Sequence, residues 1–344
     1  MHTLILGTVL SLTTSLSLTQ PGAALDDGQT IAPEIKVLEE RFVLHDDARE
    51  KDLPIRVVYP EQFDTDDAVP TIVYSHGAGG SGNYYSPLAH YWAARGYIVI
   101  LPTHSDSLVE SVGEDSGQSR RERVQQMLKK RRGGARGAGV LDFSDWPNRP
   151  RDVSFIIDQL DAIEQLIPDI EDRIDHNRVG VGGHSYGAFT SQLIGGTDPI
   201  GPGNFADERA QCVLLISPQG VGGLLNKGSW DGFEGPALTI TGDNDEGRDG
   251  EPAEWRREGF DLSPDDTHTL LWIDDAYHNF GGISGRILPG PDQGPANPHH
   301  VDLVQRATLA FWDHHLRHLS TDVDAFADEL RELFKGESLS IESN

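Results

Sequence analysis

The sequence has a single cysteine, Cys212, and far fewer basic than acidic residues. One cysteine excludes an intrachain disulfide and a cysteine metal cluster. The 28 lysines and arginines stand against 55 aspartates and glutamates, which gives a net charge of −27. A strongly acidic chain argues against binding nucleic acid or an anionic membrane through its overall field. After the first residues, no apolar run is long enough to predict stable membrane insertion.

The N-terminal segment contains no Lys, Arg, Asp or Glu before Asp26. An apolar stretch from Leu4 to Leu18 precedes Pro21 and the small residues at 22–24. This pattern is typical of a secretory signal peptide, and we predict that residues 1–24 are removed near Ala24. The protein is then secreted or periplasmic, and residues 25–344 are expected to form a single domain, a length within the range of one large α/β domain.

Short apolar runs alternate with amphipathic segments along the chain, which predicts an α/β fold with a mostly parallel central sheet covered on both faces. Residues 35–46 and 52–60 are predicted to form an N-terminal antiparallel hairpin. The other strands are expected within 71–80, 97–105, 177–184, 211–220, 236–245 and 268–278. Helices are expected over 86–96, 149–166, 188–194, 301–319 and 324–334, so that residues 321–344 form a C-terminal helix and tail.

Residues 105–148 interrupt this alternation with a long polar insertion or flap, of a length that usually carries function or disorder rather than simple linkage. Within it, residues 120–136 contain eight basic residues in an otherwise acidic chain. One interpretation is a flap that attracts an anionic ester to the active site. The other, which we favour, is a solvated helix that the acidic body neutralises.

Ser185 lies in Gly183-His184-Ser185-Tyr186-Gly187, after a buried strand and before a predicted helix. Serine between glycines at that point indicates a nucleophile elbow, a tight turn that presents the hydroxyl above the carboxyl end of the sheet. The flanking glycines are expected because side chains there would collide with neighbouring backbone. We therefore predict that Ser185 is the nucleophile of a serine hydrolase.

A serine hydroxyl needs a base and an acid that orients the base. His278 follows the last strand of the core and comes after an acidic loop in the chain, which suits the base. That acidic loop offers Asp243 and Asp245; we favour Asp245, which lies further along the loop and turns back more easily, and keep Asp243 as the alternative.

The reaction also requires backbone N–H groups that bind a developing oxyanion. The residue after the nucleophile, Tyr186, supplies one in this arrangement. The loop 75–82, rich in glycine, is expected to supply the other from Ala78, with Gly77 as the second choice.

The segments around these residues resemble the α/β-hydrolase fold, and within it the dienelactone hydrolases and platelet-activating-factor acetylhydrolase-like bacterial esterases. The resemblance covers residues 35–320 and includes "IVYSHGAGGSGNYYSPLAHYWAARGYIVILPTHSDS", "GHSYGAFT", "TGDND" and "YHNFGG". It implies a Ser-His-Asp triad, and by the family pattern G-x-x-D the acid falls on Asp245.

From these residues we expect hydrolysis of carboxylic esters through an acyl-enzyme intermediate, with a small-molecule or lipid-like ester as substrate. A phospholipase A2 or platelet-activating-factor acetylhydrolase type of activity on short acyl groups is the enzymatic alternative. An inactive scaffold that acts as a binding protein is the alternative of another class. No cofactor or metal is expected, since the pairs His299–His300 and His314–His315 are adjacent on a helix and do not share a face.

Overall fold

The computed structural model describes residues 36–108, 145–201, 203–286 and 293–344. The predicted signal peptide, residues 1–24, and the basic segment, residues 120–136, lie outside the described residues.

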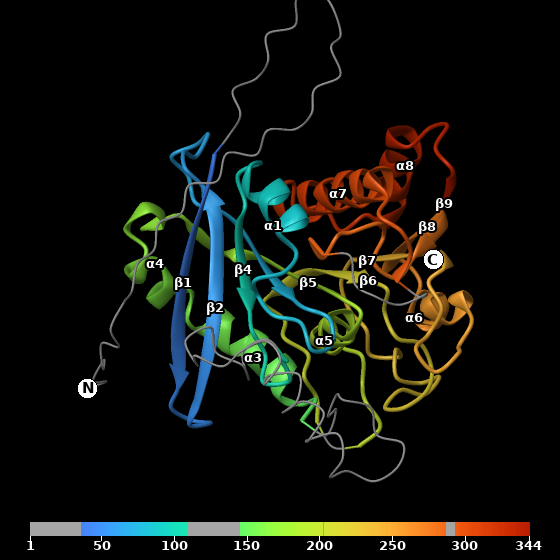
Figure 1. The fold of residues 1–344 in the computed structure, drawn as a ribbon, viewed down its shortest axis with the longest axis horizontal. Helices are drawn as coiled ribbons and strands as arrows, with labels where there is room; N and C mark the ends of the chain where they lie inside the picture. Colours follow the sequence, from blue (N-terminus) through green and yellow to red (C-terminus); the bar gives the residue numbers. More distant parts are fainter. Residues whose placement is uncertain (1–35, 109–144, 202, 287–292) are drawn as a thin grey trace, which may run out of the picture.

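A nine-stranded sheet with the order β1-β2-β4-β3-β5-β6-β7-β8-β9 forms the centre of the described structure (Figure 1). Its strands are β1 Val37–Asp46, β2 Lys51–Pro60, β3 Val69–Ser75, β4 Ile98–Pro102, β5 Ile174–His184, β6 Ala210–Ile216, β7 Ala237–Asn244, β8 His268–Tyr277 and β9 Leu339–Ser343. Along the part of the sheet with the order β4-β3-β5-β6-β7-β8, every strand pairs in parallel with its neighbour. The predicted α/β fold with a mostly parallel sheet is therefore confirmed.

Strands β1 and β2 pair antiparallel along their full length, from Val37 opposite Pro60 to Asp46 opposite Lys51. This is the hairpin predicted from the sequence. Strand β2 then pairs antiparallel with β4 and so attaches the hairpin to one edge of the parallel sheet.

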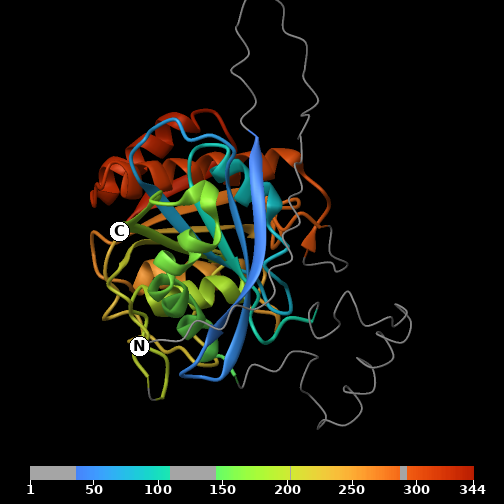
Figure 2. The ribbon, with the colours of Figure 1, turned by 90° about the vertical axis from the view of Figure 1, so that its left-hand side faces the viewer.

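Helices cover both faces of the sheet, and each face has its own hydrophobic core. One core includes buried side chains of α1 Ser86–Ala93, α7 Pro298–Trp312 and α8 Val323–Leu333. The other includes α3 Asn148–Asp158, α4 Leu160–Leu166 and α5 Tyr186–Ile194. Figure 2 shows the red C-terminal helices and the green helices on opposite sides of the strands. Both faces of the central parallel strands β3 and β4 and of most of β5, β6 and β7 are thus removed from water, as their continuous apolar sequences indicate.

The packing against β5 explains two of its glycines. A Cβ atom on Gly180 would lie 2.6 Å from the ring of Trp312, and one on Gly182 would lie 3.2 Å from the ring of Tyr74. Trp312 is fully buried at the end of α7. Glycine in the strand therefore allows the large rings on this face to approach the backbone of β5.

Three details differ from the sequence prediction. The helix expected over 149–166 breaks at Gln159, whose φ of −107° and ψ of 11° separate α3 from α4. A turn Ala253–Arg257 and the short helix α6 Glu258–Leu262 were not predicted. Residues 339–343, expected as a tail, form β9 and pair antiparallel with β8, because the edge of β8 offers backbone groups that need partners.

A buried histidine at the start of β8 makes the stability of this fold sensitive to acid. Burial lowers the pKa of His268 to about 3, and the centre of its ring lies 4.5 Å from that of Phe233 and 6.5 Å from that of Phe260. The unfolded chain has the ordinary histidine pKa of about 6.5 and so binds the proton more tightly than the folded protein does. Stability contributed by neutral His268 is therefore complete above about pH 6.5 and is lost as the pH falls toward 3.

We expect wild type to lose about 2 kcal/mol more of its free energy of unfolding between pH 7 and pH 5 than His268→Leu does. Urea unfolding at the two pH values measures this difference. The matched control is His318→Gln, which replaces an exposed histidine and should lose as much as wild type. Equal losses in wild type and His268→Leu would contradict the prediction.

Candidate functional site

Ser185 occupies a strained turn between β5 and α5. Its φ of 57° and ψ of −118° lie outside the regions that side chains prefer. A Cβ atom on Gly183 would lie 2.3 Å from the Gly187 backbone, and one on Gly187 would lie 2.0 Å from the carbonyl oxygen of Ser75. Only glycine fits at both positions, so the turn holds the Ser185 side chain up at the carboxyl edge of the sheet.

The structure brings Ser185, His278 and Asp245 together from the carboxyl ends of β5, β8 and β7. The hydroxyl of Ser185 lies 3.0 Å from Nε2 of His278, and Nδ1 of His278 lies 2.7 Å from Oδ1 of Asp245. Ser185 and His278 are partly exposed, whereas Asp245 is fully buried. The serine and the imidazole can therefore meet a ligand from solvent while the carboxylate stays behind them.

Asp243, the alternative acid, points elsewhere. Its carboxylate accepts hydrogen bonds from the indole N–H of Trp272, at 2.6 Å, and from the backbone N–H of Asp275, at 2.9 Å. Asp243 therefore binds the second half of β8, and Asp245 is the carboxylate that reaches His278.

Three polar side chains that the sequence analysis did not identify surround the Asp245 carboxylate. Ser217 and Thr241 donate hydrogen bonds to its Oδ2, the latter at 3.0 Å, and the guanidinium of Arg256 lies 3.4 Å from Oδ1. Burial opposes ionisation, but Arg256 and the neighbouring His278 outweigh it and lower the pKa of Asp245 below its usual value. The carboxylate is thus held as an anion beside the imidazole.

Arg256 also fixes the loops that carry the site. This buried guanidinium donates to the backbone carbonyls of Asp245, Ser217, Pro218 and Glu246, at 3.0 to 3.3 Å. No motif in the sequence signals this role, because the arginine is eleven residues beyond Asp245 in a segment predicted as loop.

The loop after β3 lies beside the elbow, because β3 and β5 are neighbours and Ser75 pairs with Gly183. Within this loop the Gly77 N–H donates to the Tyr85 hydroxyl and the Gly79 N–H donates to Asp106. Among the described residues, the N–H of Ala78 has no such acceptor. Of the two donors considered from the sequence, the N–H of Ala78 is therefore available to a ligand, whereas the N–H of Gly77 is bound to Tyr85.

His184, inside the elbow, links this loop to the loop of His278. The Gly77 N–H donates to the Tyr85 hydroxyl at 3.1 Å, which in turn donates to Nδ1 of His184 at 2.9 Å. Nε2 of His184 then donates to the carbonyl oxygen of His278 at 2.7 Å. Burial lowers the pKa of His184 to about 3, so the ring stays neutral and can both accept and donate.

A second Ser-His-Asp arrangement lies beneath the site. Ser75 Oγ is 2.6 Å from Nε2 of His104, and Nδ1 of His104 is 2.8 Å from Asp152. All three side chains are buried, and Asp152 is also paired with Arg49 and Lys51. This buried array cannot meet a substrate, and it ties β3, β4 and α3 together.

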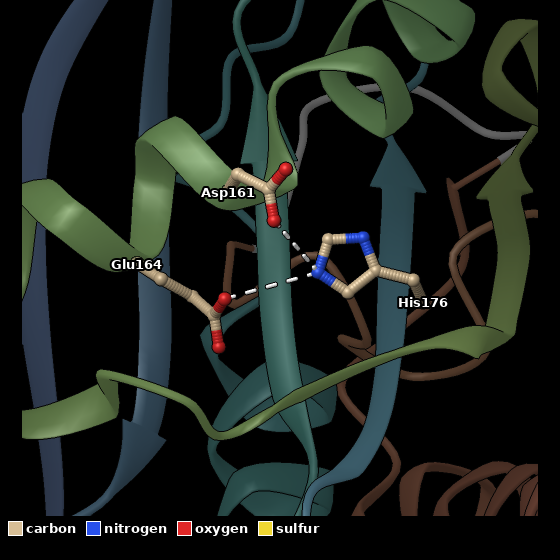
Figure 3. Close-up of side chains that lie close together, drawn as sticks. All are labelled: Asp161, Glu164 and His176. Atoms are coloured by element: carbon tan, nitrogen blue, oxygen red, sulfur yellow. Dashed lines mark ion pairs between the residues drawn. The ribbon is translucent and has the colours of Figure 1, made fainter.

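One group of described side chains has the donor types of a metal site. His176 lies 3.4 Å from Asp161 and 3.8 Å from Glu164, so the three form an ion-pair cluster (Figure 3). Glu164 is also held by the backbone N–H of Ile174. His176 stands near the start of β5, and at about 3.3 Å per residue the cluster is far from Ser185. It is not part of the candidate site.

The two histidine pairs weighed in the sequence do not converge on a common point. His299 pairs with Glu337 at 3.1 Å, whereas His314 pairs with Glu329 at 3.0 Å. Nδ1 of His315 donates to the backbone carbonyl oxygen of Ser320 at 2.6 Å. Each pair therefore serves contacts among the C-terminal elements.

Comparisons with known proteins agree with this architecture. A family model for platelet-activating factor acetylhydrolase, isoform II, matches residues 44–132, a part that holds Ala78 but not Ser185, Asp245 or His278. A ferulic acid esterase from Streptomyces cinnamoneus has a similar structure, with a TM-score of 0.54 and 18% identity over 84% of this chain and 92% of that one. The chain has the α/β-hydrolase fold.

A second solved structure supports the same fold. A candidate dienelactone hydrolase from Klebsiella pneumoniae subsp. pneumoniae superposes on this chain with a TM-score of 0.51 and 14% identity over 80% of this chain and 98% of that one. The resemblance inferred from the sequence is thus confirmed.

A comparison with curated proteins finds no match. No helix in the described part of the chain has the length and apolar character needed to cross a membrane.

Removing Arg256 tests how strongly the site depends on its buried cation. We expect Arg256→Gln to lower the free energy of unfolding at pH 7 by about 3 kcal/mol, because the change leaves the Asp245 carboxylate buried without its cation. The adjacent Arg257 is the matched control: it is partly exposed and pairs with Asp261 and Glu342. Arg257→Gln should cost at most about 1 kcal/mol, and equal costs in urea unfolding would contradict the role of Arg256.

Proposed function

We propose that this α/β hydrolase is a serine esterase that cleaves carboxylic esters through an acyl-enzyme intermediate. The observation that carries the proposal is the unbroken line from Ser185 through His278 to Asp245, with contacts of 3.0 Å and 2.7 Å. Three strand ends that are far apart in the sequence supply these side chains, and a strained backbone holds the first of them.

In the proposed reaction, Nε2 of His278 accepts the proton of the Ser185 hydroxyl as its oxygen attacks the ester carbonyl. Asp245, held ionised by Arg256, accepts a hydrogen bond from Nδ1–H of His278 and stabilises the imidazolium that forms. The N–H groups of Tyr186 and Ala78 bind the oxyanion. His278 then protonates the leaving alcohol, and water repeats the sequence on the acyl-enzyme.

Short acyl groups on a phospholipid-like alcohol are a second candidate substrate. The match to the acetylhydrolase family model at residues 44–132 supports this candidate. The likeness to a ferulic acid esterase, at 18% identity, supports ester hydrolysis in general. Rates on neutral and choline-bearing esters of increasing acyl length would separate the two.

We also propose, from residues 1–24 of the sequence, that the enzyme is exported.

Replacing the nucleophile tests the proposal directly. We expect Ser185→Ala to lower kcat for p-nitrophenyl acetate by at least about 10⁴-fold. Within the described part of the chain, the only other hydroxyl against the His278 ring is that of Ser217, which is buried on the Nδ1 side. A fluorophosphonate probe should label wild type and not this variant. Ser75→Ala, which removes the buried serine of the second array, is the control and should keep the label. Labelling of Ser185→Ala would refute the assignment, and an unlabelled wild type would instead favour a binding scaffold.

The two aspartates of the acid loop give a second test. We expect Asp245→Asn to lower kcat by about 10⁴-fold, because an amide cannot stabilise the imidazolium and favours the wrong tautomer. Asp243→Asn removes a carboxylate of the same loop and should change kcat by less than about 3-fold, since Asp243 contacts Trp272 and not His278. Steady-state kinetics with p-nitrophenyl acetate measures both, and the reverse order would assign the acid to Asp243.

A further inference from the structure

Arg149, near the start of α3, places a buried cation under the loop that carries Ala78. Only 2% of the residue is exposed. Its Nη1 donates to the carbonyl oxygen of His76 at 2.7 Å, and its Nη2 donates to that of Gly77 at 3.4 Å. Nε and Nη2 also bind the two oxygens of Asp106, at 2.9 and 2.8 Å. This forked pairing fixes the plane of the guanidinium.

Asp106, which pairs with Arg149, also binds the backbone on the other side of Ala78. The same Asp106 oxygen that pairs with Nη2 accepts the N–H of Gly79 at 3.1 Å. Burial opposes ionisation of Asp106, but the guanidinium outweighs it and holds the pKa of this carboxyl well below its usual range. Arg149 and Asp106, called here the loop clamp, therefore fix the carbonyls before Ala78 and the N–H after it.

The clamp determines where the Ala78 N–H points. A trans peptide is planar, so its C=O and N–H point in opposite directions. The Gly77 carbonyl accepts a hydrogen bond from Nδ1 of His76 at 2.7 Å and a longer one from Nη2 of Arg149 at 3.4 Å. The N–H of Ala78 in the same peptide therefore points away from both side chains. The neighbouring peptide follows the same rule: the His76 carbonyl faces Arg149, and the Gly77 N–H faces the Tyr85 hydroxyl.

The same cation contacts the loop that carries the other proposed donor. The guanidinium carbon of Arg149 lies 4.3 Å from the centre of the Tyr186 ring, a distance at which a cation is attracted to the ring face. Tyr186 directly follows Ser185. One buried side chain thus touches both the loop after β3 and the first residue of α5.

We propose that Arg149 is a positioning residue for ester hydrolysis: with Asp106 it directs the Ala78 N–H toward the oxyanion that forms beside Ser185. The inference rests on the proposed function and adds to it a residue that never touches the substrate. Because the donor is needed most when negative charge develops on the carbonyl oxygen, its loss should affect the transition state more than substrate binding.

The test replaces Arg149 with an uncharged side chain of similar length. We expect Arg149→Met to lower kcat for p-nitrophenyl acetate by about 10²-fold or more, the effect of losing one oxyanion donor, with KM changed by less than about 3-fold. The acid limb of the pH profile of kcat/KM should stay in place, because His278 and Asp245 keep their contacts.

A second substrate distinguishes a role of Arg149 in positioning the oxyanion donor from a role in stabilising the fold alone. In a thionoester the carbonyl oxygen is replaced by sulfur, so the developing charge lies on a larger atom that accepts N–H hydrogen bonds poorly. The ratio of kcat/KM for an ester to that for its thionoester should therefore fall by about 10-fold or more in Arg149→Met. General loosening of the fold would lower both rates together and leave the ratio unchanged.

Two further variants complete the experiment. Arg151→Met, an exposed arginine on the same helix, is the control and should keep the wild-type ratio and kcat. Arg149→Lys keeps the charge but not the planar fork, and it decides the outcome if Arg149→Met does not fold; it should also lower the ratio. A wild-type ratio in the folded Arg149 variant overturns the inference. A wild type without esterase activity would instead overturn the proposed function.

Discussion

The close approach of Gly187 to the Ser75 carbonyl oxygen determines how the site is assembled. Any side chain at 187 would lie within 2.0 Å of that oxygen, so only glycine lets the first turn of α5 settle against the end of β3. This contact places Ser185 beside the loop that contains Ala78. It also brings His184 within reach of Tyr85, and through them the loop of His278 is tied to the same edge of the sheet.

Buried arginines organise this edge in a chain that has few cations. Arg149 and Arg256 are almost fully buried, and each binds one carboxylate and two or more backbone carbonyls. A guanidinium suits this task because it stays charged when buried and offers several donors in one plane. The acidic surface sets the net charge of the molecule, whereas these internal cations set the local field around Asp245 and the loop of Ala78.

The sequence contained enough to predict the fold and the three side chains that meet. A buried strand, a glycine-flanked serine and a helix are local features, and the neighbours of Ser185 in sequence determine its turn. The choice between Asp243 and Asp245 rested on how a loop bends, and the contact of Asp243 with Trp272 decides it only in three dimensions. Arg149 and Arg256 left no signal, because neither lies in a motif and many of their partners are backbone carbonyls, which every residue has.

Two elements were missed because the local pattern of the sequence does not show them. Gln159 breaks the helix inside a stretch whose apolar periodicity continues, so the periodicity alone predicts one helix. Strand β9 has no fully buried side chain, and its stability comes from pairing with β8 rather than from its own composition. Strand β9 depends on a partner distant in sequence, as the roles of the two buried arginines do.

The buried array of Ser75, His104 and Asp152 reproduces the order of contacts seen in Ser185, His278 and Asp245. A search by side-chain geometry alone would report two equivalent reactive centres in one polypeptide. Solvent access is what distinguishes them, since Ser185 reaches the surface and Ser75 does not. Ser75 therefore serves as an internal comparison for Ser185: the same three groups are aligned around it, but no reactant can reach its hydroxyl.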